Sequence, residues 1–209
     1  MDDFKIVRFV DLKACKRIFS EDSTFVLGSH KHYRYIEGIK QDTKEGIIKI
    51  KNIHANSPCN CLISCWTRLE TGKLTEDDWN IFTTNEDKPM LAFVSTPKKV
   101  EDFLKCTLDI KSGNLFFLID KGKVIYYTQD TKLPDDKHFW KLGFYKKQEF
   151  CNEREYRFVL VYTTFHHSID FYTFITHNPE CYYDEIFYNP KASIEDAREL
   201  DKILNGRKL

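Results

Sequence analysis

The sequence predicts an α+β fold, with one domain over residues 1–209 in which a mixed or antiparallel sheet of short strands is flanked by helices. Short runs of β-branched and aromatic residues recur along the chain, whereas helical periodicity is confined to segments near its start, middle and end. Hydrophobic residues make up 42% and aromatic residues 15% of the chain, which is typical of a packed globular protein. No internal repeat, low-complexity tract or linker divides the sequence, so a single domain is expected.

The first third of the chain alternates short strands with short helical segments. The helix is predicted because Leu12, Cys15 and Phe19 fall at helical spacing. Ser29 can cap the helical turn that follows the second strand. The expected elements are a strand at 4–9, a helix at 11–20, a strand at 24–27, a helical turn at 29–38 and strands at 45–53 and 60–66.

The middle of the chain carries the clearest helix-start signals. Thr75 and Asp78 stand at the N-cap and N3 positions of a helix predicted over 75–82. A strand at 91–94 then leads to a helix that begins with Thr96 as N-cap and Pro97 at its first position.

The last part of the chain is predicted to be rich in strands. A hairpin is expected from 115–120 and 123–127, with its turn at Asp120-Lys121-Gly122. The strongest strand pattern spans 150–162, and a further strand is expected at 184–188. Ser193 then caps a final helix whose apolar positions follow helical spacing.

Charge and targeting signals argue against several classes of protein. The 32 basic and 32 acidic residues give a net charge of zero, whereas proteins that bind nucleic acid through phosphate contacts usually carry a basic excess. The first residues are acidic where a signal peptide is basic, and no apolar run approaches the roughly 18 residues of a membrane span. A cytoplasmic protein without a membrane partner is therefore expected.

The cysteines and histidines do not form a recognisable metal site. Cys59, Cys61 and Cys65 lack zinc-ligand spacing, and no second Cys/His pair follows them. None of the seven histidines forms a metal-ligand spacing with a carboxylate. We therefore expect no metal, and we interpret the seven cysteines as reduced thiols, with this cluster as buried structural residues.

The sharpest candidate site opens the strand predicted at 150–162. With a period of two, Glu153, Glu155 and Arg157 point to one face and are followed there by Val159 and Val161, which places the charges at the rim of a sheet. Two such carboxylates lie roughly 6–7 Å apart along a strand. Their repulsion raises the pKa of at least one, and Arg157 acts in the opposite direction. This arrangement suits binding of a sugar hydroxyl or stabilisation of a developing cation; a surface charge ladder on an edge strand is the alternative.

Other candidate ligand-binding residues lie earlier in the chain. Arg8 and Arg34 have aromatic neighbours, and an arginine there is either a phosphate clamp or a surface residue with a buried stem. Ser95 and Thr96 precede a helix N-terminus, where helix capping is the favoured interpretation and anion binding is compatible with it.

The order of these motifs resembles a widespread prokaryotic and phage family of unknown function with W-x-x-Y and E-x-E-x-R signatures. Here the first signature ends in Phe82 instead of the usual Tyr. The segments that carry the resemblance are Ile6–Phe9, Tyr33–Gly38, Asp42–Gly46, Cys65–Thr67, Trp79–Phe82, Ala92–Thr96, Gly122–Tyr126, Tyr145–Arg157 and Ile186–Leu204.

That family's layout is similar to ADP-ribosyltransferase-like proteins, especially toxins of phage-defence and toxin–antitoxin loci. The similarity implies that NAD is the substrate and that a carboxylate stabilises the oxocarbenium-like ribose formed when the nicotinamide bond breaks. Glu155 would take that role and Glu153 would orient the acceptor, a protein or a nucleic acid.

The same similarity assigns the nucleotide-binding residues. Arg8 or Arg34 would hold the pyrophosphate, Tyr33 or Trp79 would stack on a ring, and Ser95 with Thr96 would match a Ser-Thr element. The alternative function is a non-enzymatic sensor or interaction protein of phage–host conflict, in which the charged strand is an interface or a structural ion network. Nucleic-acid processing through a basic segment at 137–147 is a third reading. The oligomeric state is unknown.

Overall fold

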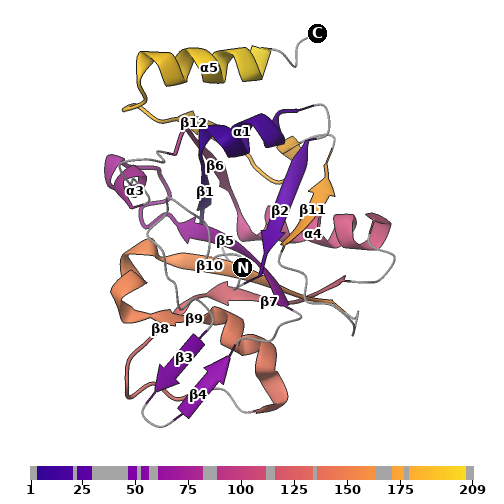
Figure 1. Cartoon of the computed structure of the whole chain (residues 1–209), viewed down its shortest axis with the longest axis vertical. Helices are drawn as coiled ribbons and strands as arrows, with labels where there is room; N and C mark the ends of the chain where they lie inside the picture. The colour runs from indigo at the N-terminus through magenta and orange to yellow at the C-terminus, as the bar shows by residue number, and fades with distance from the viewer. Residues whose placement is uncertain are drawn as a thin grey trace.

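The large sheet consists of eight strands in the described part of the chain, and its strand pairs are antiparallel (Figure 1). The computed structural model describes residues 4–20, 23–29, 47–50, 53–56, 61–81, 89–111, 116–133, 136–162, 171–176 and 179–205. The eight strands are β1 (Ile6–Val10), β2 (Thr24–Gly28), β5 (Cys61–Arg68), β6 (Leu91–Ser95), β7 (Phe116–Lys123), β10 (Glu155–Tyr162), β11 (Phe171–Ile175) and β12 (Glu185–Tyr188).

Helices and two small strand pairs complete the single α+β domain, which confirms the predicted fold class. The α-helices are α1 (Leu12–Ile18), α3 (Glu76–Asn80), α4 (Pro97–Lys111) and α5 (Ile194–Asn205). The 3-10 helices are η1 (Asp136–Phe144), η2 (Gln148–Glu153) and η3 (Pro179–Cys181). The small pairs are the antiparallel β3 (Ile47–Ile50) with β4 (Ile53–Asn56) and the parallel β8 (Ile125–Tyr127) with β9 (Tyr145–Lys147).

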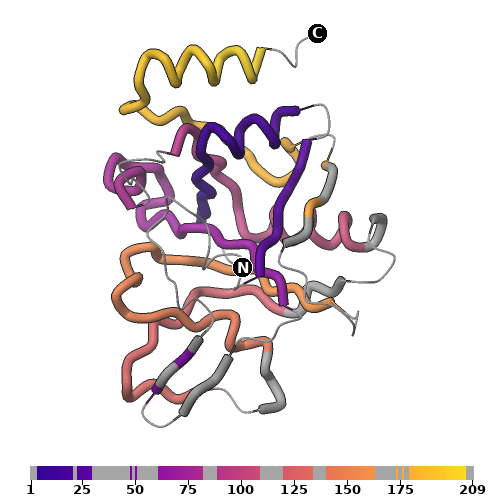
Figure 2. Tube along the Cα trace, in the orientation of Figure 1, coloured from indigo at the N-terminus to yellow at the C-terminus, as the bar shows by residue number. Residues whose placement is uncertain are grey.

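The sheet forks at β5. One edge of β5 pairs with β10 from Thr67 to Cys61, and β10 pairs in turn with β7. The opposite edge is shared, because β1 pairs with Thr67 and Arg68 whereas β2 pairs with Ile63. Beyond the fork, β1 continues through β6 to β12, and β2 continues to β11 (Figure 2).

The main hydrophobic core lies on one face of this forked sheet, where α1, α4 and α5 contribute apolar residues. Alternate residues of β10 point into it, as the period of two predicts. Its largest buried side chains include Trp66, Phe93, Phe158 and Tyr182. Aromatic pairs in edge-to-face contact, such as Phe25 with Tyr182 at 4.9 Å, hold the parts of the core together.

The other face of β5 and β10 is covered by a second group of elements. Val159 and Ile63 pack there with Phe144 at the end of η1. A separate small cluster joins β3 to the β8–β9 pair through Ile48, Ile50, Tyr127 and Tyr145. We call η1, η2 and the strands β3, β4, β8 and β9 the small layer; it lies below the large sheet in Figure 1.

Most predicted helices and strands are confirmed, and the capping box at the start of α3 is formed as the sequence indicates. The Thr75 hydroxyl accepts a hydrogen bond from the Asp78 backbone N–H, and the Asp78 carboxylate accepts one from the Thr75 N–H. Ser193 caps α5 in the same way, since its hydroxyl accepts the Asp196 N–H. The helical turn predicted at 29–38 lies almost entirely outside the described residues.

Three predicted elements are wrong. The single strand expected at 45–53 is instead β3 and β4, which pair antiparallel with Ile50 opposite Ile53. The expected hairpin turn at Asp120-Lys121-Gly122 does not exist, because β7 continues to Lys123 and pairs with β10 there. The strand expected from residue 150 begins only at Glu155, since residues 148–153 form η2. The last two errors concern the surroundings of the candidate carboxylates.

Candidate functional site

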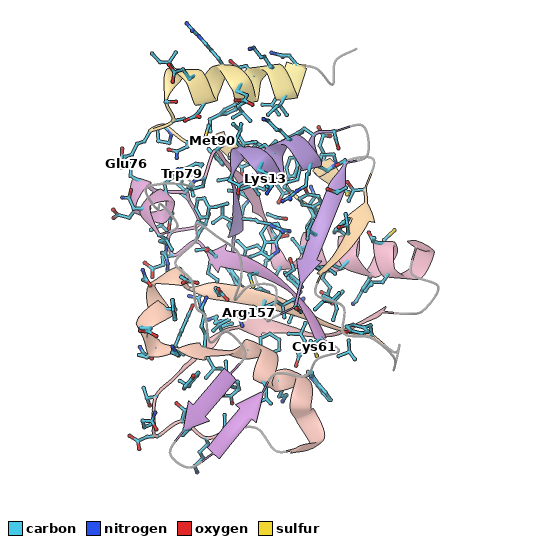
Figure 3. All side chains as sticks on the ribbon, in the orientation of Figure 1. Lys13, Cys61, Glu76, Trp79, Met90 and Arg157 are labelled. Atoms are coloured by element: carbon cyan, nitrogen blue, oxygen red, sulfur yellow. The ribbon has the colours of Figure 1, made fainter. Side chains whose placement is uncertain are left out.

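Four charged side chains are buried together where β10 meets the small layer. Lys146, Glu153, Glu155 and Arg157 each have at most 8% of their surface exposed. Figure 3 labels Arg157 beside β10. Because β10 lies between β5 and β7 and the four side chains are buried, the alternative of a surface charge ladder on an edge strand is wrong. Glu155 is the first residue of β10, so the charges do lie where this strand begins.

The four charges alternate in sign along a chain of hydrogen bonds. The Lys146 ammonium donates to Glu153 Oε2 at 2.6 Å and to Glu155 Oε1 at 2.8 Å. Arg157 Nε donates to Glu155 Oε2 at 2.5 Å, and its Nη1 donates to the Gly143 carbonyl at 2.9 Å. Among the described residues, two cations therefore contact Glu155, whereas one contacts Glu153.

Three separate elements place these groups together. Lys146 lies on β9, in parallel register with Tyr126 on β8. The Tyr126 hydroxyl accepts the backbone N–H of Glu155 at 2.8 Å. Glu153 ends η2, and Arg154, with φ 48°, turns the chain into β10 through the left-handed region. This turn brings both carboxylates to the same ammonium group, although Glu153 does not belong to the strand.

Arg154 also ties this turn to α3. Its guanidinium forms an ion pair with the buried Asp78, the residue of the capping box, and a second one with Glu70 at 3.5 Å. A non-glycine residue in the left-handed region costs about 1–3 kcal/mol and persists where surrounding contacts fix it. The ion pair with Asp78 is such a contact.

The two carboxyl groups have opposite pKa shifts. Burial raises the pKa of Glu153 from 4.5 to about 8, and the charge of Glu155 acts in the same direction. Burial also opposes ionisation of Glu155, but the Arg157 and Lys146 cations outweigh it and hold the pKa of Glu155 well below its usual range. As the pH falls, Glu153 therefore takes up a proton before Glu155 does.

These shifts predict how stability depends on pH. Between pH 4.5 and about 8 the folded protein keeps a proton on Glu153 that the unfolded chain loses, so stability should fall as the pH rises through this window. Each unit of pKa difference corresponds to about 1.4 kcal/mol, so the loss should reach a few kcal/mol. Urea unfolding at several pH values measures it, and Glu153→Gln should remove this decline. Equal declines in both proteins would contradict the prediction.

The register places Arg8 on the opposite face of the sheet from Glu155. Residues paired across neighbouring strands share a face. Thr67 pairs with both Glu155 and Val7, so these three residues share one face, and Arg8, next to Val7, points to the other. The structure therefore does not bring Arg8 and Glu155 together in one site.

Arg8 instead supports the fork in the sheet. Its guanidinium donates to the Val26 carbonyl of β2 at 3.1 Å and lies 4.7 Å from the centre of the Phe25 ring. It therefore joins β1 to β2 on the side of the main core. Such contacts are those of an arginine with a structural role.

Trp79, Ser95 and Thr96 each have a structural contact of their own. Trp79 is 4% exposed and packs edge-to-face on Phe9, beside α3 in Figure 3. Ser95 is fully buried on the main-core face, because it pairs with Ile6. Thr96 caps α4 by accepting the Lys99 N–H at 3.3 Å. Tyr33 and Arg34 lie outside the described residues.

Sequence reasoning missed Lys146 and Tyr126. Both residues lie on three-residue strands, β9 and β8, which pair in parallel although about twenty residues separate them in the sequence. No local sequence pattern therefore predicts that Lys146 and Tyr126 contact Glu155. The sequence does contain one signal for a buried cation, the lysine pair that precedes the E-x-E-x-R element. The alternation of side chains along a strand does not, however, say whether Lys146 or Lys147 points inward. Lys147 is more exposed and pairs with Glu149.

Comparison with known protein families, curated proteins and solved structures finds no match for this chain. In the described residues, no group of three or more His, Cys, Asp or Glu side chains is arranged to hold a metal ion. Within the same ranges, no helix is both long enough and apolar enough to cross a membrane.

Proposed function

We propose that the chain is an NAD-utilising enzyme of the ADP-ribosyltransferase-like class, of the kind that acts in phage defence or toxin–antitoxin loci. The observation that supports this proposal is the pair of adjacent carboxyl groups whose pKa values are shifted in opposite directions. Two such groups in one site are a common basis for divided catalytic roles, because one stays ionised while the other exchanges a proton.

The proposal gives each carboxyl group a different task. Glu155, kept ionised by Arg157 and Lys146, would stabilise the positive charge that develops on the ribose as nicotinamide leaves. Glu153, once ionised, would accept the proton of the attacking group on a protein, nucleic acid or water. The rate should therefore rise as the pH increases toward about 8.

The nucleotide-binding part of the proposal changes with the geometry. Arg8 and Ser95 lie on the opposite face of the sheet from Glu155, and Trp79 is buried against Phe9. This proposal therefore assigns the pyrophosphate contact to Arg34 and the stacking contact to Tyr33. Neither lies in the described residues, and both remain predictions from the resemblance. Arg34→Met should accordingly raise the KM for NAD.

Glu153→Gln is the variant that tests the carboxylate pair. Glutamine keeps the shape and hydrogen bonds of the protonated acid but cannot accept a proton, so turnover should fall by roughly 100-fold or more. Release of free nicotinamide from NAD measures it, and the variant should melt no lower than the wild type near pH 7, because glutamine removes the cost of keeping a proton on Glu153 there. Glu149→Gln is the control, because Glu149 lies in the same helix η2 and is exposed.

Two outcomes of the nicotinamide assay would contradict the proposed NAD-utilising activity. If wild-type protein releases no nicotinamide above the uncatalysed rate, or if Glu153→Gln releases it at the wild-type rate, the carboxylate pair is not an NAD site. Glu155→Gln is the poorer variant for this purpose. It weakens contacts with both Arg157 and Lys146, so lost activity would be accompanied by lost stability.

A second candidate function is that of a non-enzymatic interaction protein. Its support is the exposure of apolar side chains on and after the last strand of this order: Phe187 and Tyr188 of β12 are 39% and 55% exposed, and Ile194 of α5 is 73% exposed. Exposed aromatic residues on a sheet edge are typical of contact surfaces. If NAD is not cleaved while Tyr188→Ser abolishes the protein's effect on phage infection, this candidate is favoured.

A further inference from the structure

The backbone N–H of Glu155 is bound by a side chain, although the ladder between strands would normally supply its partner. Val124, the residue between β7 and β8, lies opposite Glu155, because the next pair in the register is Tyr156 with Lys123. The Val124 N–H donates to the Glu155 carbonyl at 2.9 Å. Two residues that form a closely spaced antiparallel pair normally exchange both hydrogen bonds. Here the Glu155 N–H donates to the Tyr126 hydroxyl at 2.8 Å.

The path of the chain after β7 explains this change of partner. Beyond Val124 the chain continues as β8, which pairs with β9 instead of β10. Tyr126 on β8 is in parallel register with Lys146 on β9. One short strand pair therefore supplies both the hydroxyl that binds the Glu155 backbone and the ammonium group that binds its carboxylate, each at 2.8 Å.

We propose that Tyr126 is a positioning residue of the candidate site: its hydroxyl fixes the backbone of Glu155, so that the carboxylate lies between Lys146 and Arg157. As a role in turnover, this inference rests on the proposed NAD-utilising function. It differs from the roles given above to the charged groups, because Tyr126 acts on the backbone of Glu155 and contributes no charge.

The other contacts of this backbone show why the hydroxyl matters. The Arg154 carbonyl accepts the Arg68 N–H of β5 at 3.0 Å, and the Glu155 carbonyl accepts the Val124 N–H. Tyr126 adds the bond to the Glu155 N–H, the group nearest to where the side chain leaves the backbone. Burial raises the pKa of Tyr126, so the phenol stays protonated near neutral pH and does not serve as a base.

Tyr126→Phe removes the hydroxyl alone, and Tyr145→Phe is the matched control. Tyr145 lies on β9, and its hydroxyl donates to the Lys132 carbonyl at 3.2 Å, so each variant loses one neutral hydrogen bond. In assays of nicotinamide release, Tyr126→Phe should lower kcat about tenfold or more and keep the KM for NAD within about twofold. A catalytic group displaced by about 1 Å can cost roughly 100-fold in rate. Tyr145→Phe should keep the wild-type kcat.

Amide exchange followed by NMR gives a second readout that needs no NAD. The Glu155 N–H should be protected in the wild type, and Tyr126→Phe should lower this protection about tenfold, because the amide has lost its acceptor. Tyr145→Phe should leave this amide unchanged.

Three results would overturn the positioning role: a wild-type kcat in Tyr126→Phe, an equal loss of kcat in Tyr145→Phe, or unchanged protection of the Glu155 amide in Tyr126→Phe. If Tyr126→Phe does not fold, the wild-type amide decides the question. Protection supports the contact, and exchange as fast as that of an unprotected amide refutes it. A wild type that releases no nicotinamide contradicts the proposed enzyme instead, and the exchange result still decides whether Tyr126 fixes Glu155.

Discussion

Replacing Arg157 by methionine is expected to lower the free energy of unfolding by about 3–5 kcal/mol. Arg157 is 1% exposed, and its guanidinium contacts Glu155 and the Gly143 carbonyl. Methionine retains much of the side-chain volume but leaves Glu155 with one buried cation in place of two. Removing one partner from a buried ion pair costs this much, because the remaining charge has already lost its hydration.

Urea unfolding of the variant near pH 7 measures the effect, with Arg198→Met as the matched control. Arg198 lies on the exposed side of α5, and its replacement should change stability by less than about 0.5 kcal/mol. The variant should also move the pKa of Glu155 upward, since the Arg157 charge is the largest influence that lowers it. A loss as small as that of the control would mean that the buried ion network contributes little to the fold.

Replacing Phe93 by alanine should be at least as damaging, with a loss of about 3–5 kcal/mol. Phe93 is fully buried on β6 and contacts the rings of Phe19, Tyr182 and Tyr183, the last in a stacked arrangement at 4.9 Å. Its removal leaves a cavity between β6, α1 and the segment before β12. The cost combines the lost transfer free energy with the cavity that the neighbours cannot fill.

Phe187→Ala provides the control on the adjacent strand. Phe187 belongs to β12, which pairs with β6, but its ring is 39% exposed. The same substitution there should cost less than about 1 kcal/mol. Comparable losses at the two positions would show that β12 contributes to the core more than its exposure indicates.

The parts of the fold with local signals could be predicted from the sequence. The capping box of Thr75 and Asp78, the Thr96 cap and the alternation of apolar residues along β10 each act within a few residues, and each is confirmed. The false hairpin at Asp120-Lys121-Gly122 shows the limit of such signals. Pairing with β10 over most of its length holds β7 extended through a sequence that otherwise favours a turn.

The candidate site could be predicted only in part, because its geometry depends on register between distant strands. Glu155 and Arg157 were identified together because they lie two residues apart on one strand. Lys146 reaches them through a parallel pairing of β8 with β9, and the face of Arg8 follows from pairings among β1, β5 and β10. No periodicity within a single segment contains that information.

The position of β1 also determines when the sheet can form during synthesis. This first strand lies between β5 and β6, so its two neighbours are translated some 50 to 85 residues after it. Strand β10, which joins β7 to β5, is later still, at residues 155–162. The emerging chain must therefore keep the apolar strand β1 without its two neighbours until residues 61–95 have been made, and the sheet is completed only after β10, which favours slow folding.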